Sequence, residues 1–104
     1  MHGGIMTSKQ RSYLKSLAST LEPLFNVGKA DVTPEVVNAI SEALEARELI
    51  KINVLKNCET EPKEVGITLS DRTRSECVQV IGRKIVLYRP AKDPKQRKIV
   101  LPVK

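Results

Sequence analysis

Aromatic side chains are scarce in this sequence, which contains Tyr13, Phe25, Tyr88 and no tryptophan among 104 residues. A hydrophobic core must therefore be built from aliphatic residues, which supply most of the 40% hydrophobic content. All three rings fall within apolar segments, where such rings more often belong to a core. Stacking of bases on exposed aromatic rings is therefore a minor way for this chain to bind nucleic acid.

Residues for metal binding and nucleophilic catalysis are also lacking. Cys58 and Cys77 are 19 positions apart, and His2 is the only histidine. A zinc site needs about four Cys or His ligands, and a catalytic thiolate needs a partner such as histidine. The sequence has no Gly-rich phosphate-binding motif. We therefore expect no catalytic residues, no metal, no cofactor and no small-molecule substrate.

Long apolar runs are absent as well. The stretch 85–88 lies between Lys84 and Arg89, far short of the roughly 18 residues that a membrane-spanning helix needs. Residues 1–6 lack the apolar core of a secretory signal and are interpreted as a leader or a cloning remnant. We expect a cytoplasmic protein with reduced thiols and one folded domain over residues 7–102.

Negative charge is scarce near the C-terminal end. The chain has 18 Lys and Arg against 12 Asp and Glu, a net charge of +6. Residues 1–52 are neutral, whereas residues 83–104 hold eight basic residues and one acid, Asp93. A surplus placed so unevenly attracts polyanions and raises their encounter rate. A nucleic-acid partner is the leading interpretation, and a tail that only aids solubility is the alternative.

The spacing of apolar residues predicts helices and strands in alternation. The segment 33–47 opens with Thr-Pro-Glu, which supplies an N-cap, a first-turn proline and a first-turn acid. Alternating apolar and polar residues after 48 indicate a strand with one buried face. The expected elements are helix 8–18, strand 24–27, helix 33–47, strand 48–54, helix 63–75, strand 77–81 and strand 85–88.

This α-β-α-β-α-β-β order is that of a single α/β domain, with a mixed sheet of about four strands covered by helices. The last two strands are expected to form an antiparallel hairpin, because the turn contains Gly82, which adopts a positive φ at little cost. The apolar segment 99–101 is expected to dock as an edge strand. The acids Glu42, Glu45 and Glu48 are expected on a solvated helix surface.

The loop 28–31 joins a predicted strand to the start of helix 33–47. Free backbone N–H groups and the helix dipole at such a terminus favour a phosphate. Gly28 lets another backbone approach closely, and Lys29 adds a positive charge. A plain structural turn is an equally good interpretation of this segment when it is taken alone.

Several separated segments, in the same order, resemble one known family. They are 27–33, 43–51, 78–82 and 85–90. Together they resemble the YhbY proteins, which are bacterial stand-alone CRM domains, over nearly all of residues 7–102. The resemblance implies a fold like the C-terminal domain of translation initiation factor three. It also implies RNA binding during assembly of the large ribosomal subunit.

In that family the loop after the first strand is a GxxG motif, similar to the loop by which KH domains clamp a nucleic-acid backbone. Gly28 matches the first glycine, but Asp31 stands in the place of the second. The Asp31 carboxylate either repels phosphate or serves the N-terminus of the following helix. Here the sequence departs from the pattern of the family that it resembles.

The sequence thus predicts a non-catalytic RNA-binding protein that associates with precursor or immature large ribosomal subunits, with large-subunit ribosomal RNA as its partner. The alternative is a protein-interaction module that docks on a ribosomal protein or an assembly factor. DNA binding fits less well, because helix 33–47 has an acidic outer face and no helix-turn-helix pair is visible. The candidate RNA-binding residues are Gly28, Lys29, Ala30, Asp31, Arg11, Lys15, Arg83 and Lys84.

Overall fold

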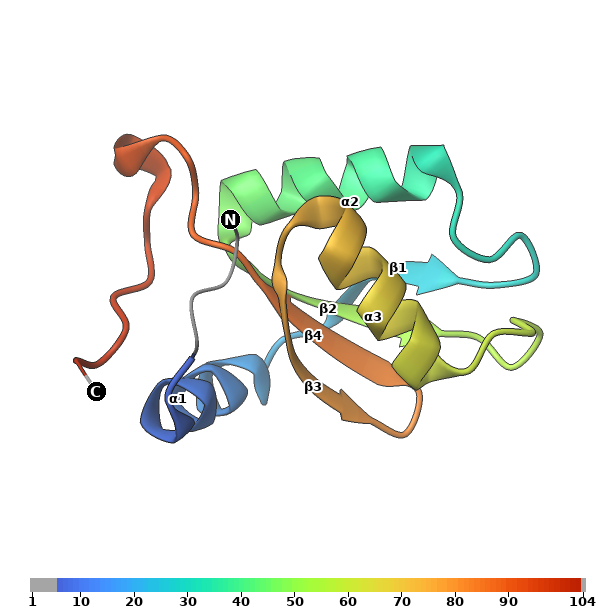
Figure 1. Cartoon of the computed structure of the whole chain (residues 1–104), viewed down its shortest axis with the longest axis horizontal. Helices are drawn as coiled ribbons and strands as arrows, with labels where there is room; N and C mark the ends of the chain where they lie inside the picture. Colours follow the sequence, from blue (N-terminus) through green and yellow to red (C-terminus); the bar gives the residue numbers. More distant parts are fainter. Residues whose placement is uncertain (1–5, 104) are drawn as a thin grey trace.

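The computed structural model describes residues 6–103 and confirms the expected α/β fold and element order (Figure 1). A short 3-10 helix, η1, follows the last strand. The elements are α1 (Ser8–Ala18), β1 (Pro23–Val27), α2 (Pro34–Arg47), β2 (Leu49–Val54), α3 (Pro62–Thr73), β3 (Glu76–Ile81), β4 (Lys84–Tyr88) and η1 (Pro94–Gln96).

The strands form one mixed sheet in the order β1-β2-β4-β3. β1 runs parallel to β2, and β4 is antiparallel to both of its neighbours. The predicted hairpin between β3 and β4 is confirmed, and Gly82 in its turn has a φ of 57°. Because α2 returns the chain for the parallel pair, the carboxyl ends of β1 and β2 lie at the same edge of the sheet.

The helices α2 and α3 cover one face of the sheet (Figure 1). Alternate residues of β2, namely Ile50, Ile52 and Val54, are almost fully buried against them. α3 approaches β3 closely at Gly66, where a Cβ would lie 3.1 Å from Sγ of Cys77. The glycine therefore serves helix-to-sheet packing, although it lowers the intrinsic helix propensity of the segment.

α1 packs on the other face and covers only part of it. Leu14 and Ala18 are buried against residues of β2, β3 and β4. Nη1 of Arg11 donates to the carbonyl oxygens of Cys77 and Val78, at 3.1 and 2.8 Å. These carbonyls lie where the register of β3 is irregular, so Arg11 holds α1 to the strand at this point.

The expectation that 99–101 forms an edge strand is wrong, because no strand follows β4 up to residue 103. Instead, Lys98 and Ile99 donate their backbone N–H groups to Oε1 of Glu48, at 2.7 and 2.9 Å. The N–H of Ala91 donates to the other carboxylate oxygen, at 2.7 Å. The C-terminal segment is thus anchored through one side chain rather than through a sheet ladder.

The expected solvated surface of acids is also wrong for Glu48, and it holds only in part for Glu45. Glu48 is completely buried, and Glu45 accepts hydrogen bonds from the N–H groups of Lys92 and Asp93. These N–H groups, aided by Arg89, hold the pKa of Glu45 below its ordinary value. Only Glu42 is exposed as expected. Both exceptions bind backbone donors more than 40 residues away, which helical spacing does not reveal.

Replacing Glu48 tests this anchor. Burial raises the pKa of Glu48, but hydrogen bonds from Ala91, Lys98 and Ile99 outweigh burial, and the pKa lies below its ordinary value. The carboxylate therefore stabilises the fold above the unfolded-state pKa of about 4.3, and this contribution disappears as the pH falls through the lower folded-state pKa. We expect Glu48→Gln to cost about 2 kcal/mol at pH 7, because an amide has one acceptor oxygen for three donors.

Thermal unfolding between pH 3 and pH 7 measures the effect, with Glu42→Gln as the control for loss of an exposed charge on α2, the helix that ends just before Glu48. The difference in the free energy of unfolding between wild type and Glu48→Gln should become smaller as the pH falls. A difference that is the same at every pH would contradict the proposed anchoring by the ionised carboxylate.

Candidate nucleic-acid interface

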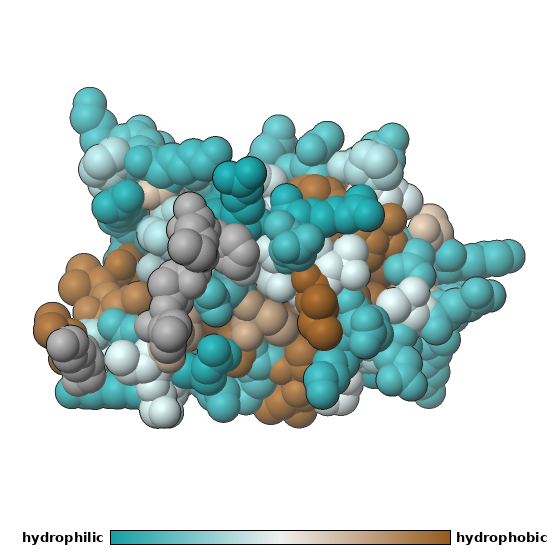
Figure 2. All heavy atoms as spheres, viewed as in Figure 1, coloured by the Kyte–Doolittle hydropathy of each residue, from teal (hydrophilic) through white to brown (hydrophobic). Residues whose placement is uncertain are grey.

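Three connections meet at one end of the sheet: the loop 28–33 after β1, the loop 55–61 after β2, and the hairpin turn 82–83 (Figure 1). The backbone itself joins them. The N–H of Leu55 donates to the carbonyl oxygen of Val27, at 2.8 Å, and the N–H of Val54 donates to that of Arg83, at 2.7 Å. Hydrophilic side chains gather at this end in the space-filling view (right side of Figure 2).

The predicted loop 28–31 lies at one side of this group, after the edge strand β1, and packs against the loop 55–61. A Cβ on Gly28 would lie 3.1 Å from both Oδ1 of Asn57 and Cδ1 of Leu55, so the glycine allows the two loops to touch. Lys29 and Ala30 are exposed. The start of the loop therefore packs against the loop 55–61. The rest of the loop exposes a short stretch of backbone and one lysine.

Asp31 connects the two loops. It has a φ of 61°, a left-handed conformation that glycine adopts more readily than other residues. Its Oδ1 accepts the N–H of Val32, and its Oδ2 accepts the hydroxyl of Thr60. Thr33, not Asp31, caps α2, by accepting the N–H of Val36 at 3.1 Å. The carboxylate thus orders the loop, a role that depends on a residue 29 positions away.

The two hairpin residues differ in their surroundings. Arg83 folds back on β2, where its Nε donates to the carbonyl oxygen of Val54 and its Nη2 to that of Leu55, both at 2.7 Å. Lys84 is exposed and begins β4. Lys56, an exposed lysine of the neighbouring loop, joins this group although sequence reasoning did not single it out. Its only sign in the sequence is its position between the predicted strand 48–54 and the predicted helix 63–75.

The two α1 candidates are not brought to this end. Figure 1 shows α1 and η1 toward the opposite end of the long axis from the loops 28–33 and 55–61. Lys15 is exposed, whereas Arg11 already binds two carbonyl oxygens of β3. The predicted residues therefore divide into one group around the loops and a separate pair on α1.

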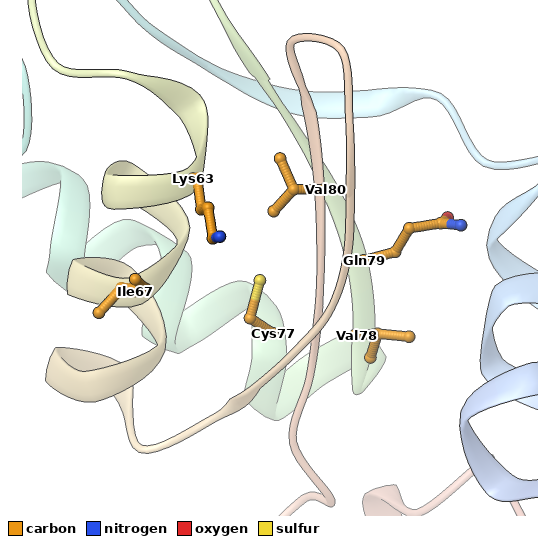
Figure 3. A pocket seen from close by; sticks show the side chains of 6 residues that line it. All are labelled: Lys63, Ile67, Cys77, Val78, Gln79 and Val80. Carbon is orange, nitrogen blue, oxygen red and sulfur yellow. The ribbon is translucent and has the colours of Figure 1, made fainter. Parts of the chain in front are cut away.

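A shallow groove of about 450 Å³ lies between α3 and the edge strand β3 (Figure 3). Lys63 and Ile67 border it from the helix, and Cys77 and Val80 from the strand. Burial raises the pKa of the Cys77 thiol, although Arg11 opposes this effect. A raised pKa disfavours the thiolate that a nucleophilic or metal-binding cysteine requires.

Between residues 6 and 103, no three His, Cys, Asp or Glu side chains gather in a way that could hold a metal ion. None of the helices found there has the length and apolar character needed to cross a membrane.

Known proteins are similar to this chain over most of its length. The family model for the CRS1 / YhbY (CRM) domain matches residues 6–89. "Probable RNA-binding protein YqeI" of Bacillus subtilis is 48% identical over 92 residues, which cover 88% of this chain and 96% of that protein. An "RNA-binding protein" of Haemophilus influenzae is 38% identical over 91 residues, which cover 86% of this chain and 91% of that protein. The solution structure of the hypothetical protein SAV1595 of Staphylococcus aureus has a TM-score of 0.75 and 46% sequence identity to this chain. The match covers 94% of this chain and 100% of that one.

The contact between Asp31 and Thr60 can be tested by Thr60→Val, which removes the hydroxyl and keeps the shape of the side chain. We expect the amides of residues 28–32 and 57–60 to exchange hydrogen faster, by about tenfold, because a hydrogen bond to a carboxylate contributes about 1.5 kcal/mol. Thr20→Val, in an exposed turn, is the control. Unchanged exchange in both loops would show that this bond does not order them.

Proposed function

Because the chain belongs to the CRS1/YhbY (CRM) domain family, we propose that it is an RNA-binding protein that assists assembly of the large ribosomal subunit. The observation that carries this proposal is the grouping of the loop 28–31 with exposed lysines at one end of the sheet. Lys29 lies in that loop, Lys56 in the loop beside it, and Lys84 at the start of β4. Positive side chains around an accessible backbone turn favour a phosphate chain.

The loop geometry supports contact with the RNA backbone rather than with single bases. Gly28 leaves room for close approach, and the contact between Asp31 and Thr60 fixes the far end of the loop. A fixed loop loses less conformational entropy when it binds than a mobile one. The exposed lysine then supplies a charge whose effect depends on salt but not on base identity.

The proposed target is the ribosomal RNA of precursor or immature large subunits. The family resemblance supplies this target, and the relatives compared above are named only as RNA-binding proteins. The positive surplus of the C-terminal part fits a large polyanionic particle. Its cations include the exposed Lys92 and Lys95 in the anchored segment around η1, and Figure 1 shows this segment toward the opposite end of the molecule from the loops 28–33 and 55–61.

A second candidate function is docking on a ribosomal protein or an assembly factor. The groove between α3 and the edge strand β3 favours it, because edge strands and apolar grooves accept extended peptides. Ile67 on its rim has an exposed fraction of 52%. Binding of the purified chain to protein-free ribosomal RNA would separate the two candidates, since a module that recognises only protein would not bind it.

The first test of RNA binding is Lys29→Ala. We expect weaker binding with an unchanged fold, because the side chain is exposed and makes no hydrogen bond within residues 6–103. Loss of one phosphate contact should flatten the slope of log affinity against log salt concentration by roughly 0.7 to 0.9. Arg47→Ala, at the opposite end of α2, removes an exposed charge away from the loop and is the control. Equal slopes for the two variants would remove Lys29 from the interface.

The assembly role needs a test in cells. We expect crosslinking of the chain to nucleic acid, followed by sequencing, to recover large-subunit ribosomal RNA and its precursor in excess over other RNAs. Lys29→Ala in the same cells should lower the recovery if the loop makes the contact. Recovery of messenger or transfer RNA without ribosomal enrichment would contradict assembly of the large subunit and leave RNA binding itself standing.

A further inference from the structure

The face of the sheet that carries α1 is uncovered toward the loop end. Asn26, Asn53, Lys84 and Ile81 are in register there, one from each strand, and we call them the exposed row. Asn26, Lys84 and Ile81 are exposed, with Ile81 at 62%, and Asn53 is half-buried. No aromatic ring belongs to the row.

Strand alternation places the row on this face. In β2, Ile52 and Val54 are buried beneath α2 and α3, so Asn53 between them points to the opposite face. Leu49 points to that face as well and packs with α1. α1 therefore covers the start of β2 and leaves Asn53 beyond it.

The two asparagines hold each other in place. Nδ2 of Asn53 donates to Oδ1 of Asn26, at 3.1 Å, and neither amide makes another side-chain hydrogen bond within residues 6–103. A primary amide has two N–H donors and an oxygen that accepts two hydrogen bonds. The pair therefore presents an acceptor, Oδ1 of Asn53, and a donor, Nδ2 of Asn26, from fixed positions on an exposed sheet.

We propose that this amide pair selects bases of a single-stranded RNA segment whose backbone is held at the loop 28–31. Asn26 lies two residues before Gly28, about 7 Å along the strand, so the row and the loop form one continuous surface. The inference rests on the proposed RNA binding and adds base selection to it. Lys84 in the same row supplies a cation for phosphate beside the amides.

The chemistry of the face favours RNA over an acidic protein. Neither the exposed row nor the next row toward α1 contains a carboxylate, and each contains a lysine, Lys84 and Lys51. Lysines alone would attract any polyanion. Amide donors and acceptors are the groups by which asparagine binds adenine, and unpaired RNA bases expose the edges that such groups contact.

Because no aromatic ring belongs to the exposed row, hydrogen bonding is the means by which this row can distinguish bases. Stacking would hold any base with similar strength. A fixed amide pair instead favours a base with the complementary arrangement of donor and acceptor. The expected result is a modest base preference, superimposed on backbone contacts that are independent of sequence.

The experiment compares wild type, Asn26→Ala and Asn53→Ala in binding to fluorescent single-stranded oligomers of A, C and U of equal length. We expect wild type to prefer one oligomer. In each variant, the ratio of the affinity for that oligomer to the affinity for the others should fall by about tenfold. The salt dependence should stay unchanged, since no charge is removed. Asn38→Ala, an exposed asparagine on α2, is the control and should keep the preference. Amide chemical-shift changes on adding the preferred oligomer should include residues 26 and 53.

The outcomes separate this inference from the proposed function. If Lys29→Ala weakens binding and the asparagine variants keep the wild-type preference, the amide pair does not select bases, while RNA binding stands. A wild type that binds all three oligomers equally also overturns the inference. If no oligomer binds but polyglutamate does, the surface serves an acidic protein, and both the inference and the proposed RNA binding fail.

Discussion

Parallel pairing of β1 with β2 is the constraint on which the candidate site depends. A parallel neighbour requires a crossover, which α2 provides, and the crossover brings the ends of both strands to one edge. The antiparallel β4 then adds its hairpin turn at the same edge. The loop 28–31 thus gains two neighbours that lie far from it in sequence, the loop 55–61 and the hairpin turn beside Lys84. The fold and the arrangement of the candidate site both follow from the same pairing.

Local patterns predicted most of the fold. The Thr33 cap with Pro34, the alternation in β2 and the turn glycine Gly82 each act within a few residues, and each was confirmed. Contacts made at long range were not predictable in this way. Glu48 binds donors about 50 residues away, and Asp31 binds Thr60 from another loop. A single sequence shows that such polar residues exist but not which backbone groups will meet them.

The same distinction applies to the candidate site. The sequence identified the loop and the excess of basic residues, because glycine, lysine and net charge are local or additive properties. It did not indicate that Arg83 binds the end of β2, that Arg11 holds α1 to β3, or that Lys56 joins the loop group. Two arginines that composition assigns to polyanion binding therefore also support the structure, and their roles were decided by packing.

The buried carboxylate of Glu48 has a consequence for where the domain ends. The family model stops at residue 89, before Ala91, Lys98 and Ile99, which donate all three backbone hydrogen bonds to this side chain. A fragment that ended at residue 89 would contain every strand, but it would lose all three donors to Glu48 together with the segment that carries them. Hydrogen bonds that stabilise this fold thus reach about ten residues beyond the similarity boundary, where no strand remains to be paired.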